Sequence, residues 1–103
     1  MGKLREQQSK FVYLTHLLIK HAYDRGYELT FGDTYAKSGH ITKSNHYRKC
    51  AIDLSLFKDG KFLTETEDHK FLGDFWESLD PKNRWGGRFS DGNHYELVPE
   101  GWR

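Results

Sequence analysis

The chain has 103 residues, enough for one compact domain, and 16 basic against 15 acidic residues leave a formal net charge of +1. This balance supplies no global attraction for DNA, RNA or an anionic membrane, which argues against a nucleic-acid module. We expect residues 1–103 to form a single soluble domain that works as a monomer.

The single cysteine, Cys50, excludes an intramolecular disulfide, and its place in an apolar run favours a buried structural role over a catalytic one. The N-terminal segment lacks both the run of about 20 apolar residues that a membrane span needs and the apolar region of a secretory signal. We therefore expect no signal peptide, no stable membrane insertion and synthesis in a cytoplasm.

An amphipathic helix is predicted over residues 3–24. Phe11, Leu14, Leu18 and Ala22 recur at spacings of three and four residues, which places them on one face of a helix. Gly26 is a plausible stop for this helix.

Strands are predicted from alternating apolar and polar residues over 27–35 and 50–56, with a loop between them at 36–45. The Asp59-Gly60 pair is typical of a two-residue hairpin, so a return strand is expected near 61–63.

A second helix is predicted over residues 64–80, with Pro81 just beyond its end. The stretch RWGGRF reads as a strand interrupted by glycines, and HYELV at 94–98 alternates again. The order of elements predicts the α+β class, with a small antiparallel sheet flanked by helices.

The alternation also predicts which side chains meet. Asp53 lies on the strand face opposite Ile52 and Leu54, and His94 and Glu96 share one face of the last strand. If these two strands pair in register, Asp53 and His94 face the same side.

His46, in the turn before the 50–56 strand, would add a second imidazole to Asp53 and His94. Two imidazoles and one carboxylate suit Zn²⁺ and leave a fourth position for water, as in catalytic zinc sites. The alternatives to a metal site are that Asp53 lies on a solvent-exposed strand face and that His94 lies in an ordinary turn.

A proton acceptor is also needed if a water is to attack an amide. Asp91, three residues before His94 in the sequence SDGNHYEL, is the first candidate. Glu96 is the competing base, and it is equally a candidate for orienting a metal ligand through a hydrogen bond.

These residues match a known family. SNHYRKCAIDL resembles the S-x-H-x6-D segment, and SDGNHYEL the D/E-x-x-H-x-E-L segment, of the zinc peptidases that include D-alanyl-D-alanine carboxypeptidases, D-Ala-D-Ala dipeptidases and phage L-alanyl-D-glutamate endopeptidases. The similarity covers most of the chain, from LTFGDTY through IDLSLFKDGKFL and FWESL to RWGGRFSDGNHYEL. It implies the D-Ala-D-Ala peptidase fold, which is hedgehog-like.

Carried over by position, the resemblance implies one Zn²⁺ per chain with His46, Asp53 and His94 as its ligands. It implies Asp91 as general base and acid, and Ser44 near the bound peptide. An aspartate at position 91, where many members have glutamate, resembles the phage endolysin variant.

The sequence departs from the family pattern at two places. Lys49-Cys50-Ala51 replaces the usual Gly and Ala before the aspartate strand, which is a structural position. Relatives also carry an arginine after the GD-Tyr segment, where this chain has Ala36. Lys37, Arg48 and Arg88 are the candidate replacement cations, although a lysine lacks the guanidinium fork.

The resemblance implies a zinc-dependent peptidoglycan peptidase of the phage endolysin type, which cleaves L-Ala-D-Glu in the stem peptide. Such an enzyme would accumulate in the host cytoplasm and reach the cell wall after holin-type release. The domain would act without a separate wall-binding module.

Three alternatives remain open. The same site suits a D,D-carboxypeptidase or dipeptidase acting on D-Ala-D-Ala, although a free terminal carboxylate would need a cation. A catalytically silent zinc domain that binds wall peptides or another protein is the second alternative. A nucleic-acid module, suggested by the stretch KSNHYRK, is the third, and the near-neutral charge argues against it.

The other histidines and tryptophans have mainly structural interpretations. Trp76, at helical spacing, is expected in the core, whereas Trp85 beside two glycines is equally a core residue or a contact to substrate. The histidines expected to be exposed or packed rather than metal ligands are His16, His21, His40 and His69.

Overall fold

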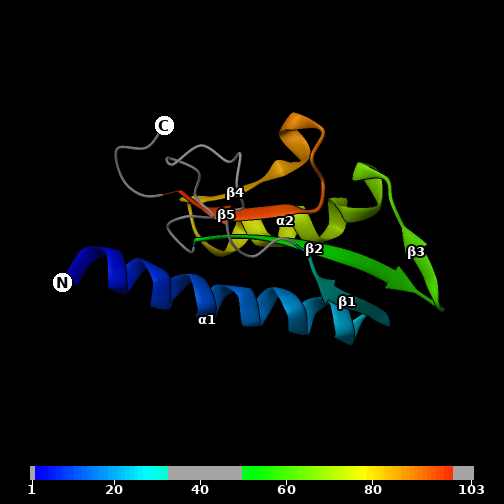
Figure 1. Cartoon of the computed structure of the whole chain (residues 1–103), viewed down its shortest axis with the longest axis horizontal. Helices are drawn as coiled ribbons and strands as arrows, with labels where there is room; N and C mark the ends of the chain where they lie inside the picture. The colour runs from blue at the N-terminus through cyan, green and yellow to red at the C-terminus, as the bar shows by residue number, and fades with distance from the viewer. Residues whose placement is uncertain (1, 33–49, 99–103) are drawn as a thin grey trace.

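The structure of the chain is a computed structural model that describes residues 2–32 and 50–98. Two α-helices and five strands form the fold in these residues, with two short 3-10 helices between them (Figure 1). In chain order the elements are α1 (Gly2–Asp24), β1 (Tyr27–Phe31), β2 (Ala51–Lys58), β3 (Lys61–Leu63), η1 (Thr66–His69), α2 (Lys70–Leu79), β4 (Asn83–Trp85), η2 (Gly86–Phe89) and β5 (His94–Leu97). The predicted α+β class is confirmed.

The five strands form one antiparallel sheet in the order β1-β2-β5-β4, and β3 also pairs with β2. Strand β2 is the longest and holds the sheet together, because its C-terminal half pairs with β1 and β3 whereas its N-terminal half pairs with β5. The register places Asp53 directly opposite His94. The conditional prediction of this pairing is therefore correct.

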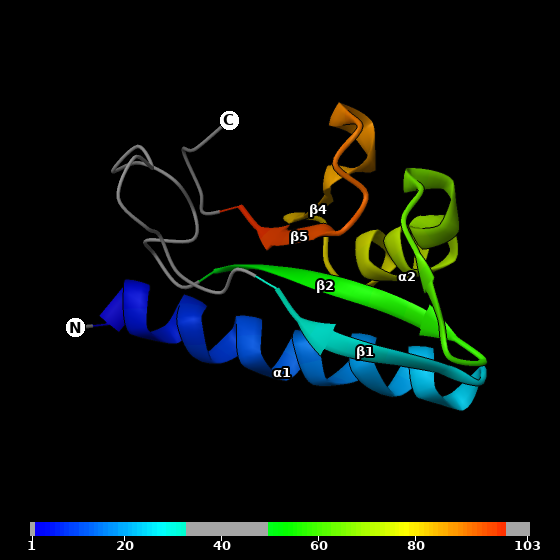
Figure 2. The same cartoon turned by 45° about the vertical axis from the view of Figure 1, so that its right-hand side comes forward.

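Helix α1 follows the predicted boundaries within a residue, and it ends where the sequence predicts. Gly26 takes a positive φ of 87°, a conformation that costs glycine no steric strain. The apolar stripe of the helix, represented by Leu14, Leu18 and Ala22, is buried in the core. Helix α1 runs beside β1 and β2 along their length (Figures 1 and 2).

The hairpin between β2 and β3 also forms as predicted. Asp59 and Gly60 both have positive φ values, 53° and 77°. Positive φ at both central residues is the requirement of a type I′ turn, whose twist matches that of the flanking strands.

Both helices pack on one face of the sheet and enclose the core with it. The ring of Trp76 on α2 lies edge-on to Phe11 of α1 at 5.8 Å and to Tyr95 of β5 at 6.2 Å between ring centroids. Alternate residues of β2 join the same cluster: Ile52, Leu54 and Leu56. Full burial of each such side chain stabilises the fold by about 1.5–3 kcal/mol. This packing holds in place the strands whose opposite face carries the polar residues.

Two predicted elements differ from the observed ones. The segment predicted as one helix over 64–80 begins with the 3-10 helix η1, and the α-helix starts only at Lys70. The stretch RWGGRF is a strand only as far as Trp85, because Gly86–Phe89 coils into the 3-10 helix η2. A side chain at Gly86 would collide with the carbonyl oxygen of Asp91 at 2.2 Å, so glycine here permits the close return of the chain.

Candidate functional site

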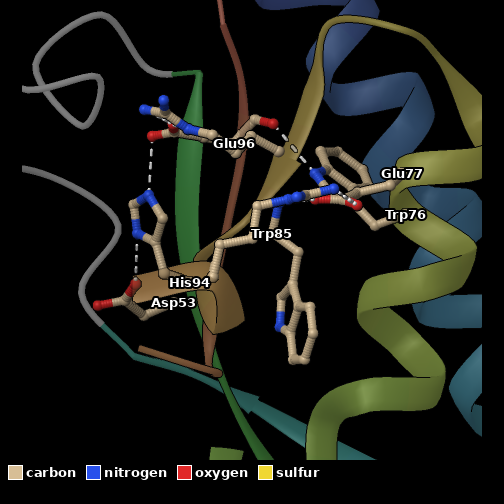
Figure 3. Close-up of polar contacts among 8 residues, drawn as sticks. Asp53, Trp76, Glu77, Trp85, His94 and Glu96 are labelled. Atoms are coloured by element: carbon tan, nitrogen blue, oxygen red, sulfur yellow. Dashed lines mark hydrogen bonds and ion pairs between the residues drawn. The ribbon is translucent and has the colours of Figure 1, made fainter. Parts of the chain in front are cut away.

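The polar face of the sheet begins with Asp53 and His94. Oδ1 of Asp53 lies 3.1 Å from Nδ1 of His94, across the pair of strands β2 and β5 (Figure 3). The main chain around Asp53 is held on both sides, since its carbonyl accepts a hydrogen bond from Gly32 at 2.7 Å and the next amide, of Leu54, donates to Asn93 at 2.9 Å. The carboxylate and the imidazole are therefore placed by the sheet itself.

Glu96 binds the other nitrogen of the same imidazole. Nε2 of His94 donates to Oε1 of Glu96 at 2.8 Å, and Oε2 of Glu96 accepts from the guanidinium of Arg84 on the adjacent strand β4. Glu96 is only 6% exposed. A continuous polar row, which we call the Asp53–Arg84 row, thus runs through Asp53, His94, Glu96 and Arg84 across three strands.

The charges in this row change the proton affinity of its members. Burial by itself lowers the pKa of His94, but the hydrogen bonds to Asp53 and Glu96 outweigh it and raise the pKa to about 9. Burial raises the pKa of Glu96, yet His94 and Arg84 bring it below its usual range. An imidazolium between two carboxylates is the state that these shifts favour when no metal is bound.

The donor atoms of Asp53 and His94 fit a zinc ion. Two ligands that each lie about 2.0–2.2 Å from a tetrahedral zinc are separated by about 3.3–3.6 Å, slightly more than the 3.1 Å between Oδ1 and Nδ1. Metal-binding histidines usually donate their second N–H to a carboxylate, and Glu96 supplies that carboxylate here.

The described residues contain two of the three predicted zinc ligands. Within residues 2–32 and 50–98, no group of three or more His, Cys, Asp or Glu side chains suffices to hold a metal. The predicted third ligand, His46, lies outside the described residues, so the ligand set stays a prediction.

Asp91 occupies a turn whose main chain is held at several points. Its amide donates to Gly86 at 2.9 Å, and its carbonyl accepts from the amide of His94 at 3.1 Å. On the following residue, the carbonyl of Gly92 accepts from the indole of Trp85 at 2.7 Å. The turn is therefore fixed relative to β5, whereas the Asp91 side chain is exposed.

A pocket of about 210 Å³ lies beside this turn. Asp91 lines it together with Leu54 and Ser55, the two residues that follow Asp53 on β2. The predicted base and the strand of a predicted metal ligand thus border one hollow. The remaining lining residues come from β3, from the segment that includes η1, and from the turn before β5.

Trp85 belongs to the core, which agrees with one of the two interpretations of this residue. It is 8% exposed, and side chains at Gly73 or Gly87 would approach its ring to 2.0 and 2.3 Å. Its indole N–H is already donated to Gly92. Gly73 on α2 and Gly87 thus make room for a closely packed, buried ring.

Arg88, one candidate for the missing family arginine, pairs with Glu77 of α2. Its Nε and Nη2 donate to the two carboxylate oxygens at 2.9 and 2.8 Å (Figure 3). Arg88 holds the pKa of Glu77 below its usual range. The guanidinium is therefore engaged by helix α2.

Several predicted residues lie outside the described part of the chain, and their roles stay predictions. These are the ligand His46, the candidate substrate contacts Ser44, Lys37 and Arg48, the departure at Ala36, and His40.

The tryptophan and histidine expectations that can be compared with the structure agree with it. Trp76 is fully buried, and Cys50 is also buried in the core. His16 is exposed on α1, and His21 stacks on Phe75 with 3.7 Å between ring centroids. His69 is packed, as expected, but its polar surroundings were not foreseen.

Sequence reasoning missed two polar residues of this region, Arg84 and His69. Arg84 is opposite Glu96 in the register of β4 and β5, and no local pattern reports that pairing. His69 bonds to Tyr95, 26 positions away along the chain. Both contacts depend on pairing between distant parts of the sequence. The one local signal that could have pointed to either was the charge of Arg84 next to a predicted strand.

None of the helices in the described part of the chain combines the length and apolar character needed to cross a bilayer. No protein-family model matches the sequence, and no curated protein is significantly similar to it. Solved structures do share its α+β fold. One is the crystal structure of the L-Ala D-Glu endopeptidase ChiX from Serratia marcescens, with a TM-score of 0.69 and 14% sequence identity over 94% of this chain and 87% of that chain.

Proposed function

We propose that this chain is a zinc-dependent peptidoglycan peptidase of the endolysin type that hydrolyses the L-Ala-D-Glu bond of the stem peptide. The observation that carries the proposal is the Asp53–Arg84 row, in which one nitrogen of His94 lies 3.1 Å from a carboxylate oxygen and the other is bound by Glu96. This row occurs on the fold of an L-Ala D-Glu endopeptidase.

The chain's own residues divide the work. Asp53 and His94, with His46, would hold one zinc ion, and Glu96 would keep the His94 ring in the orientation that directs Nδ1 toward the metal. When bound, zinc would lower the pKa of a water to about 7 and polarise a carbonyl. Asp91 would accept a proton from the attacking water and pass it to the leaving amine.

The pocket beside Asp91 favours an internal amide over a free carboxyl terminus. Its lining includes the carboxylates of Glu65 and Asp91, and no lysine or arginine is among the described residues that line it. A D,D-carboxypeptidase must bind the terminal carboxylate of its substrate, which two carboxylates would repel. We infer that this pocket receives an uncharged amide of the stem peptide and that the free carboxylate of the D-Glu residue lies outside it.

The proposed biological setting follows from this activity. The substrate is the stem peptide of bacterial peptidoglycan, and the enzyme would act on the wall after release from a host cytoplasm.

One assay tests the proposed activity. The zinc-loaded protein is incubated with purified peptidoglycan, and the new termini are identified by mass spectrometry. We expect free L-Ala carboxyl and D-Glu amino ends. Released D-Ala would instead identify a carboxypeptidase, and intact peptidoglycan with one zinc bound per chain would refute both activities.

Substitutions then assign the roles. Asp91→Ala is expected to retain zinc and lose turnover, whereas His46→Ala is expected to lose both. Asp74→Asn is a matched control, because Asp74 is an exposed carboxylate on α2 that pairs only locally with Lys70. Turnover of Asp91→Ala equal to that of the wild type would move the role of base to Glu96.

A further inference from the structure

A buried histidine lies next to the proposed base without taking part in the Asp53–Arg84 row. His69, the last residue of η1, is 3% exposed, yet it lines the same pocket as Asp91. A polar side chain at the wall of a pocket is a means of selecting the ligand.

The partner of His69 determines which ring nitrogen carries the proton. Nδ1 of His69 lies 2.7 Å from the hydroxyl oxygen of Tyr95, a residue with no exposed surface. In the described part of the chain this hydroxyl makes no other hydrogen bond. A buried O–H without an acceptor is unfavourable, so Tyr95 donates and Nδ1 accepts.

With Nδ1 as the acceptor, the proton of the neutral imidazole is on Nε2. Burial lowers the pKa of His69, which keeps the ring neutral near pH 7. Because Nδ1 is used by Tyr95, Nε2–H is the one donor that the ring can offer to a ligand in the pocket that it lines.

The other lining groups define which acceptor would suit this donor. Hydroxyl groups line the pocket together with the carboxylates of Glu65 and Asp91; they belong to Ser55, Thr64, Thr66 and Ser90. An anionic ligand would be repelled by the carboxylates. An uncharged amide carbonyl accepts a hydrogen bond and carries no net charge, so it is complementary to this lining.

We propose that His69 is a specificity-determining residue whose Nε2–H donates to a peptide carbonyl oxygen of the substrate in the pocket beside Asp91, and that Tyr95 positions it by holding Nδ1 as an acceptor. The proposal rests on the proposed peptidase function. It names an internal, uncharged amide of the stem peptide as the group that this pocket recognises.

The first test measures the tautomer directly and does not depend on hydrolysis. Long-range ¹H–¹⁵N NMR spectra of the full chain at pH 7 are expected to show His69 protonated at Nε2 and unprotonated at Nδ1. Tyr95→Phe removes only the hydroxyl and is expected to shift the proton toward Nδ1. A proton on Nδ1 in the wild type would overturn the proposal, whatever the protein hydrolyses.

The second test measures ligand contact in the absence of turnover. A peptide that contains L-Ala-D-Glu, with blocked termini and with the free carboxylate of D-Glu amidated, is titrated into the zinc-free wild-type chain, which keeps both pocket carboxylates, and the Nε2–H resonance of His69 is followed. A saturable downfield shift supports the contact. An unmoved resonance at saturation, or tighter binding of a D-Ala-D-Ala peptide with a free carboxylate, would overturn it.

The third test uses activity once the wild type is shown to cleave. His69→Leu is expected to raise KM about 3- to 10-fold with kcat nearly unchanged, the effect of losing one hydrogen bond to the substrate. His69→Gln retains an N–H near the position of Nε2 and is expected to restore KM to within about twofold of the wild type. Equal KM values for Leu, Gln and His at position 69 would refute the contact.

A matched control separates specificity from folding. His21→Leu removes a histidine that packs on Phe75 of α2 and does not line the pocket, so its KM is expected to match the wild type. If His69→Leu fails to fold, the tautomer and titration measurements on folded chains still decide the proposal. Absence of cleavage by the wild type would refute the peptidase function, while those two measurements would still report on His69.

Discussion

Replacing Glu96 by glutamine would test whether the Asp53–Arg84 row organises a metal site. The substitution keeps the shape of a side chain that is 6% exposed, and it removes the negative charge that both His94 and Arg84 contact. The carboxylate accepts hydrogen bonds from both His94 and Arg84. A glutamine carbonyl oxygen replaces only one of its two oxygens, and the glutamine NH₂ group would face an N–H donor of His94 or Arg84. The His94 ring would lose the acceptor that fixes its orientation.

The expected size of the effect follows from the two contacts. Loss of a carboxylate that orients a metal-binding histidine typically weakens metal binding 10- to 100-fold, which corresponds to about 1.4–2.8 kcal/mol. In the metal-free protein, the loss of charged hydrogen bonds to His94 and Arg84 is expected to lower the free energy of unfolding by about 1.5–3 kcal/mol.

Zinc affinity is measured by competition with a chromophoric chelator, and stability by urea denaturation of the metal-free chain. Glu77→Gln is the matched control, since it makes the same chemical change at a carboxylate that binds Arg88 and lies away from His94. Its zinc affinity is expected to equal that of the wild type. An unchanged zinc affinity in Glu96→Gln would refute the role of the row in metal binding.

Two further predictions concern stability. Gly73→Ala would place a methyl group 2.0 Å from the buried ring of Trp85. We expect the free energy of unfolding to fall by about 1–3 kcal/mol, the usual cost of overpacking. A urea midpoint equal to that of the wild type would contradict this packing. Arg88 lowers the pKa of Glu77 below its ordinary 4.5. The ionised carboxylate therefore stabilises the fold above pH 4.5. This stabilisation is lost as the pH falls through the lower pKa of Glu77 in the folded state. Between pH 7 and 3 the wild type should therefore lose more stability than Glu77→Gln, as compared by urea denaturation at the two pH values.

The predictions that succeeded concern structure that depends on local sequence patterns. The stripe of Leu14, Leu18 and Ala22 predicts α1, and the alternation around Asp53 predicts β2, because the periods of 3.6 and two residues are properties of the local backbone. The Asp59-Gly60 turn was predictable for the same reason, since its positive φ values favour these residue types.

Errors occurred where a local signal has more than one structural use. The glycines beside Trp85 were interpreted as interruptions of a strand, but Gly86 begins a 3-10 helix and Gly87 makes room for the indole ring. A glycine in the sequence indicates that the fold needs space or conformational freedom there, but it does not indicate which neighbouring residue requires it.

The sequence by itself determined the elements, their faces, and the candidates Asp53, His94 and Asp91. Only the tertiary structure decided that Asp53 is directly opposite His94 and that Arg84 is opposite Glu96. Strand register is set by the burial of the opposite face and by long connections, so no short stretch of sequence contains it. For the same reason, the pocket beside Asp91 and its histidine emerge only when the distant segments are packed together.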